Sequence, residues 1–183
     1  MKKIGFIGAG NMATAIIKGL MAQNDGKADF INVFDVSEEK CAAMKNMGAN
    51  VMTSADEIAK NSSIVVLAVK PQNYPEVLES LKNSITTAKT VVSIAAGISI
   101  AYVRKGLECD CPVVRVMPNT PLKLKKGATA LCPSENISDD DKTIVYNMFA
   151  GSGVCEYIDE SHMNEIIAVN GSSPAYIYLF AKA

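Results

Sequence analysis

The sequence has no tryptophan, a single histidine (His162) and no apolar run long enough to cross a membrane. A transmembrane helix needs roughly eighteen or more apolar residues in succession. The apolar start of the chain is broken at Gly8 and Gly10, and no signal-peptide cleavage site follows. The five cysteines are odd in number and lack metal-ligand spacing, so we expect neither a zinc site nor a disulfide framework. These absences predict a cytosolic protein with reduced thiols and no metal.

An excess of charge of one sign is also missing, because 18 basic residues face 19 acidic ones and the net charge is −1. Nucleic acids and anionic membranes attract strongly basic proteins, so neither is expected as a partner. The densest basic segment, Lys123 to Lys126, lies beside a glycine and is typical of a solvated loop. A length of 183 residues, of which 49% are hydrophobic, suffices for one domain with a buried core and a small appendage.

Short apolar runs alternate with helical patterns along most of the chain. Near-continuous Val, Ile and Leu runs are typical of parallel strands that are covered on both faces. The expected strands are Lys3–Gly8, Ile31–Phe34, Asn50–Met52, Ile64–Val69, Val91–Ala95, Val113–Met117 and Ala128–Leu131. The expected helices are Met12–Ala22, Ser37–Met47, Tyr74–Leu81, Ser99–Lys105, Lys142–Ala150 and Ala175–Ala183. This alternation predicts an α/β fold with a doubly wound, mostly parallel sheet.

The pattern changes near Asp159 and is helical from there on. We therefore expect residues 1–159 to form the α/β domain and residues 160–183 to form a helical linker and the start of a truncated all-helical domain. The last helix, which opens at Pro174, is apolar on most sides and needs a partner for that surface. Either the chain is a fragment, or this end packs against another chain.

A glycine-rich motif joins the first expected strand to the first expected helix. Its pattern, G-x-G-x-x-A, is typical of a dinucleotide-binding turn when a strand precedes it and a helix follows. Gly8 permits the tight turn, Gly10 lets the backbone approach a pyrophosphate, and Ala13 lets the helix pack close to the sheet. The expected cofactor contacts in this segment are Ile7, Gly8, Ala9, Gly10, Asn11, Met12 and Ala13. The alternative interpretation is a tight strand–helix turn without a ligand.

An acidic residue, Asp35, follows the second expected strand. In a Rossmann-type fold, a carboxylate at this place hydrogen-bonds the adenosine ribose and repels a 2′-phosphate. No arginine is near in sequence, and Lys40 is the closest strong cation. Asp35 therefore favours NADH over NADPH, unless it serves as a helix cap.

Three further expected strands end in residues that suit a cofactor, at the sheet edge where open α/β folds bind ligands. A lysine at the first could contact the cofactor or a substrate carboxylate, and small residues at the second leave room for a ring or ribose. The amide of Asn119 is suited to orienting the nicotinamide carboxamide. The candidates are Ala68, Val69, Lys70, Pro71, Ala95, Ala96, Gly97 and Asn119. No catalytic residue is assigned, as expected where a cofactor performs hydride transfer.

These segments together resemble pyrroline-5-carboxylate reductase. The matching runs, in the order and spacing of that family, are Ile4–Ala13, Leu67–Pro71, Val92–Gly97, Val116–Pro121 and Gly171–Tyr176. The resemblance implies the last step of proline biosynthesis, in which NADPH or NADH gives hydride to the C=N bond of 1-pyrroline-5-carboxylate and yields L-proline. It implies that the glycine-rich turn, the Val69-Lys70 strand end and Ala96 hold the cofactor. It also implies that the Asn119 loop lies beside the nicotinamide and that Gly171–Tyr176 leads into a second domain.

The chain departs from this family in length and at two sites. Family members continue into a helical domain that forms the dimer and grips the substrate, so we expect a full-length homo-oligomer built on a dimer. This chain should bind cofactor but be incomplete for catalysis. Asp35 stands where many members have Ser or Thr, and Lys123–Lys126 replaces a mostly apolar segment. Two alternatives remain open: a dinucleotide-binding module without activity, and another reductase or 3-hydroxyacid dehydrogenase of the same fold group.

Overall fold

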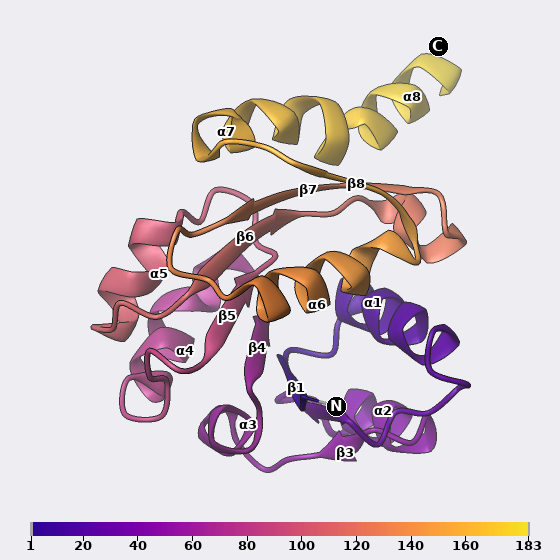
Figure 1. The fold of residues 1–183 in the computed structure, drawn as a ribbon. Coiled ribbons are helices and arrows are strands. Elements are labelled where there is room, and N and C mark those ends of the chain that lie inside the picture. Colours follow the sequence, from indigo (N-terminus) through magenta and orange to yellow (C-terminus); the bar gives the residue numbers. More distant parts are fainter. Residues whose placement is uncertain (1, 183) are drawn as a thin grey trace.

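One sheet runs through the computed structural model, which describes residues 2–182 (Figure 1). Its strand order is β3-β2-β1-β4-β5-β6-β7-β8. The strands are β1 Ile4–Ile7, β2 Ile31–Phe34, β3 Asn50–Val51, β4 Ile64–Leu67, β5 Thr90–Ser93, β6 Val113–Met117, β7 Gly127–Pro133 and β8 Gly153–Tyr157. Strands β1 to β6 are parallel, β7 is antiparallel to β6, and β8 is parallel to β7. The predicted mostly parallel, doubly wound sheet is confirmed.

Helices cover both faces of this sheet. They are α1 Asn11–Ala22, α2 Glu38–Asn46, α3 Ala55–Asn61, α4 Tyr74–Leu81, α5 Ile100–Leu107 and α6 Asp139–Ala150. Side chains of α1, α2 and α6 share one hydrophobic cluster, and those of α3, α4 and α5 share the other. Strand β1 supplies both clusters because successive side chains alternate between faces: Phe6 lies in the first and Ile7 in the second. Because both faces of these strands are covered by helices, side chains on both faces are buried, which explains the continuous apolar runs in the sequence.

Two elements of the sheet region were not predicted from the sequence. Helix α3 is seven residues long and too short to show helical periodicity. Its signal was a capping box, because the Ser54 hydroxyl accepts the Glu57 N–H while the Glu57 carboxylate accepts the Thr53 N–H. Strand β8 lies at the edge of the sheet, and only Cys155 among its residues is buried. A single buried position gives no readable strand pattern.

The chain turns helical after β8, as the sequence predicted. A short helix η3 (Glu160–His162) leads into α7 (Met163–Ile166), a π-helical turn η4 (Ile167–Gly171) and α8 (Ser173–Lys182). The predicted last position of the final helix, Ala183, lies outside the described residues. Figure 1 shows α8 projecting away from the sheet. None of the helices within residues 2–182 is long and apolar enough to cross a membrane.

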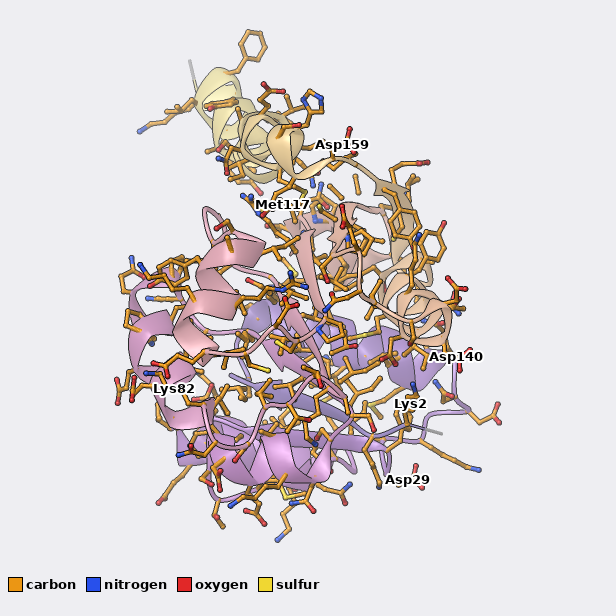
Figure 2. The ribbon with its side chains drawn as sticks, turned by 60° about the vertical axis from the view of Figure 1, so that its left-hand side comes forward. Lys2, Asp29, Lys82, Met117, Asp140 and Asp159 are labelled. Carbon is orange, nitrogen blue, oxygen red and sulfur yellow. The ribbon has the colours of Figure 1, made fainter. Side chains whose placement is uncertain are left out.

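The amino and carboxyl edges of the sheet face opposite ends of the molecule. Figure 2 shows Met117, at the carboxyl end of β6, next to the terminal helices. Lys2, which precedes β1, and Asp29, which precedes β2, lie at the other end of the same view. The segments expected to bind a cofactor therefore all end strands at the edge on the Met117 side.

Candidate cofactor site

A cavity of about 810 Å³ opens at the carboxyl ends of β1, β2 and β4. Strand β1 pairs with β2 on one side and with β4 on the other, so the strand order reverses at this point. Open α/β sheets bind ligands in the crevice at such a switch point, and the volume is in the range of small-molecule sites. The position of the cavity thus agrees with a dinucleotide site.

Part of the predicted site lines this cavity. The predicted residues in its wall are Ile7, Gly8, Gly10, Asp35, Ala68, Val69 and Lys70. The other predicted residues lie outside the lining: Ala9, Asn11, Met12, Ala13, Pro71, Ala95, Ala96, Gly97 and Asn119. The wall also contains residues that the sequence did not single out as contacts, namely Phe34, Val36, Lys40, Ser54, Ala55, Asp56, Asn73, Glu76, Val77 and Ser80. Several of these come from α3 and the loop before it, which explains why they were missed.

The two glycines of the turn are required for different reasons. Gly8 has a φ of +100°, and a Cβ there would lie 2.6 Å from the carbonyl oxygen of Ala68. The fold itself therefore demands glycine at this position. Gly10 has a φ of −72°, and a Cβ there would meet no atom within 4 Å. Because the protein alone would accept a side chain at Gly10, the open space above it fits a ligand that approaches the backbone.

The start of α1 is left without a protein cap. Gly10 occupies the N-cap position and makes no side-chain cap, so within residues 2–182 no side chain caps the first N–H groups of this helix, and no acidic residue lies in its first turn. By contrast, serine hydroxyls cap α2, α3, α5 and α6. The first N–H groups of a helix lack intrahelical partners and carry partial positive charge, which suits an anion such as a diphosphate. Ala13, in the same turn, is buried and lets α1 approach the sheet.

The carboxylate of Asp35 ties the glycine-rich turn to the loop after β2. One oxygen, Oδ2, accepts the N–H of Ala9 at 2.7 Å, and Oδ1 accepts the N–H of Ser37 at 2.9 Å. The ammonium of Lys40 lies 3.4 Å from both oxygens. Burial alone would raise the pKa of Asp35, but the two backbone donors and Lys40 together lower it. Asp35 is thus ionised, and its charge is already partly neutralised by the protein.

Lys70 lies in the loop after β4 and stands exposed in the cavity wall. Pro71 begins the short helix η1 (Pro71–Asn73), which fixes the direction of the chain directly after the lysine. Below this loop the hydroxyl of Tyr74 donates to the carbonyl of Leu67 and bonds the hydroxyl of Ser93. Burial raises the pKa of Tyr74 to about 12, so this residue is a neutral brace between β4 and β5.

The predicted residues at the ends of β5 and β6 form a second group. Ala95 is buried, Ala96 is exposed, and Gly97 has a φ of +77° with open space at its Cβ position. The amide of Asn119 bonds Asn170 and the backbone of Ala128, so its side chain is held by residues of later segments. Asn170 was not among the predicted residues, because its partner Asn119 lies 51 positions away in the sequence.

The single histidine lies outside the residues that line this cavity. His162 is exposed in η3 and pairs with Glu165, which raises the pKa of the imidazole. Within residues 2–182, no group of three or more His, Cys, Asp or Glu side chains could hold a metal ion.

Comparisons with known proteins agree with this site. A family model described as NADP oxidoreductase, coenzyme F420-dependent, matches residues 3–97, which include β1 to β5 and all residues of the cavity wall. The chain is therefore of the NAD(P)H-dependent oxidoreductase class.

More specific relatives define the family within this class. The pyrroline-5-carboxylate reductase of Escherichia coli K12 is 38% identical over 183 residues, which are all of this chain and 68% of the relative. The structure of a pyrroline-5-carboxylate reductase from Coxiella burnetii matches with a TM-score of 0.90 at 35% identity, covering 99% of this chain and 68% of that one. The Plasmodium falciparum enzyme with NADP bound matches with a TM-score of 0.86 at 32% identity, covering 99% and 66%. The chain belongs to the pyrroline-5-carboxylate reductase family and spans about two thirds of the length of these relatives.

Proposed function

We propose that this chain forms the cofactor half of a reductase that converts 1-pyrroline-5-carboxylate to L-proline. When bound, reduced nicotinamide supplies the hydride for the C=N bond of the substrate. The observation that carries the proposal is the geometry of Gly10. The fold would accept a larger residue there, whereas a diphosphate resting on the turn needs the space that a Cβ would fill.

The proposed diphosphate position lies over residues 8–13, at the uncapped start of α1. Asp35 and Lys40 lie where the adenosine ribose would be, at the end of β2. Val36 is 93% exposed and Val77 lines the same cavity, so both offer apolar surface to an adenine ring. Lys70 would contribute positive charge on the β4 side of the crevice.

The nicotinamide end of the proposed site lies toward β5 and β6. The fold places residues 95–97 and Asn119 at the ends of these two strands, next in order after β4. The exposed position of Ala96 and the open space at Gly97 leave room for a ribose or a planar ring. The proposal keeps all the predicted cofactor contacts from Ile7 to Asn119. It adds Val36 and Lys40, which line the cavity.

The remaining part of the proposal concerns residues 160–183. We assign residues 1–159 to the cofactor domain and residues 160–183 to the start of a helical domain. Large apolar side chains of α8 are more than half exposed, namely Tyr176, Ile177, Tyr178, Leu179 and Phe180. Such a surface is typical of an interface, and it supports a homo-oligomer built on a dimer. Free thiols at all five cysteines support a cytoplasmic location.

The test begins with cofactor binding by this chain. Titration with NADH and with NADPH, followed by nicotinamide fluorescence, should show saturable binding of at least one of them. Gly10→Ala should weaken that binding about tenfold or more, which corresponds to about 1.4 kcal/mol, because the methyl group occupies the diphosphate position. Its melting temperature should fall by no more than about 2–4 °C, since the methyl group meets no protein atom and only the preference for glycine over alanine at the helix N-cap is lost. Lys18→Ala, on the exposed side of the same helix, is the matched control.

The second step measures substrate-dependent oxidation of the same cofactor. We expect the chain to bind the cofactor without turnover, and a version extended with the remaining third of the Escherichia coli relative to reduce 1-pyrroline-5-carboxylate. Failure of both cofactors to bind would remove the proposed site. An extended version that binds cofactor but leaves the substrate unchanged would instead remove the reductase assignment.

A further inference from the structure

Asn170 lies in the π-helical turn η4, which joins α7 to α8. The N–H of Ser172 donates to the carbonyl of Ile167 at 3.0 Å, which is the i→i+5 bond of a π-helix. Such turns are rare and frequently occur at functional sites. The irregular turn brings the side chain of Asn170 toward the ends of β6 and β7.

The amide of Asn170 makes three hydrogen bonds there. Its Nδ2 donates to the carbonyl oxygens of Met117, at 3.0 Å, and Ala128, at 2.9 Å. Its Oδ1 accepts the Nδ2–H of Asn119 at 2.7 Å. The N–H of Ala128 in turn donates to Oδ1 of Asn119 at 3.0 Å. The two amides and the two strand ends thus form one closed network, in which both side chains have fixed orientations.

This network leaves the amide of Asn119 half used. Its Nδ2 has a second hydrogen and its Oδ1 a second lone pair, so one donor and one acceptor position remain. A carboxamide offers the complementary acceptor and donor. Without Asn170 the amide of Asn119 would be free to rotate, because only the single bond from Ala128 would hold it.

Attachment of the terminal helices does not by itself require Asn170. Arg115 is buried in β6 and bonds Asn164 of α7 at 2.6 Å and Glu160 of η3 at 3.5 Å. Met163 of α7 is buried in a small cluster with Ala130 and Cys132 of β7. These contacts join the same helical segment to the sheet without touching Asn119.

We propose that Asn170 is a positioning residue for the nicotinamide end of the cofactor, acting through Asn119. This role rests on the proposed function of the crevice. It makes the orientation of Asn119 depend on the turn that leads into α8, so the cofactor site and the terminal helices are coupled through one side chain.

The test compares two ligands, NADH and ADP-ribose, which lacks the nicotinamide ring. Asn170→Ala should weaken NADH binding about three- to tenfold, which corresponds to the free energy of about one hydrogen bond. It should leave ADP-ribose binding unchanged. Asn119→Ala should show the same selective loss. The double variant should lose no more than either single variant, because the two residues act in sequence. Asn164→Ala is the matched control and should leave the ratio of the two affinities unchanged.

Several results would overturn this role. Equal weakening of NADH and ADP-ribose by Asn170→Ala would mean that Asn170 only supports the fold, and additive losses in the double variant would mean that it does not act through Asn119. An unchanged NADH affinity would also contradict the role. If Asn170→Ala does not fold, Asn170→Ser, which keeps one donor, is judged by the same ratio. A wild-type chain that binds neither ligand would overturn the proposed cofactor site, and this role with it.

Discussion

At the carboxyl ends of β1, β2 and β4 the crevice is an open cavity beside the glycine-rich turn, whereas at the end of β6 and the start of β7 side chains from a later segment close a hydrogen-bond network. The first region depends on Gly8, Gly10 and Asp35, all within the first βαβ unit. The second depends on Asn119 and Asn170, which are 51 positions apart. The diphosphate end of the site is therefore built locally, and the nicotinamide end is built by tertiary structure.

This difference implies different responses to substitution. Damage to a backbone turn disturbs the fold around it, while damage to a side-chain network changes the orientation of one group. The predictions below concern mainly the first region, and they proceed from a loss of fold to a small change in cofactor preference.

The largest effect is expected for Gly8→Ala. The substitution imposes a strained positive φ on alanine and places its Cβ 2.6 Å from the carbonyl oxygen of Ala68. Strain and overpacking together should cost on the order of 3 kcal/mol of the free energy of unfolding. Chemical denaturation measures this loss. Gly10→Ala, two positions later, is the control and should lose no more than about 1 kcal/mol, the cost of alanine in place of glycine at the N-cap of α1. Equal losses in the two variants would contradict the distinction between the glycines.

The same contrast explains which features could be predicted from the sequence. The mostly parallel sheet and the glycine-rich turn follow from local patterns, since buried parallel strands and a G-x-G-x-x-A turn each have a short-range signature. Gly8, Gly10 and Asp35, which the sequence predicts as cofactor contacts, all line the crevice, and their contact with a cofactor stays a prediction. Helix α3 was missed because seven residues carry too little periodicity, and with it the cavity residues Ser54 to Asp56.

The hydrogen-bond network of Asn119 and Asn170 could not be predicted from the sequence, for a physical reason. Nothing near Asn170 in sequence indicates that its amide reaches Met117 and Ala128, because this contact exists only after β6, β7 and η4 are packed together. The sequence pointed to Asn119 through its place at a strand end, yet it could not show what holds the amide. Lys40 was noticed as a nearby cation, but only the fold shows its contact with Asp35.

A smaller effect is expected for Asp35→Asn, which tests how the turn is held. The asparagine amide keeps one acceptor, so either Ala9 or Ser37 loses its hydrogen-bond partner. The loss should destabilise the protein by about 1–2 kcal/mol, and it should weaken NADH more than NADPH because the negative charge that repels a 2′-phosphate is removed. Because the pKa of Asp35 is lowered in the fold, its contribution to stability is complete above the ordinary value of 3.8 and is lost as pH falls through the lowered pKa.

Two measurements check this prediction. Denaturation at neutral pH should show the loss in the variant, and the difference between wild type and variant should shrink as the pH falls below 3.8. A variant with wild-type stability would show instead that Asp35 acts only on the ribose. In that case the turn would be held by the backbone without help from the carboxylate.

The smallest effect is expected for Lys40→Met. This substitution tests how charge at the proposed ribose position affects cofactor preference while changing the stability of the fold little. Lys40 is 49% exposed and lies 3.4 Å from Asp35, so its loss should change stability by less than about 1 kcal/mol. A 2′-phosphate placed beside Asp35 would gain from a nearby ammonium group and would face an unpaired carboxylate without it. We therefore expect the affinity for NADPH relative to NADH to fall about threefold, an effect that salt should reduce. Lys45→Met, in the last turn of the same helix, controls for charge alone. An unchanged ratio would mean that Asp35 and Lys40 only hold the turn, and that the proposed adenosine ribose position does not distinguish the two cofactors.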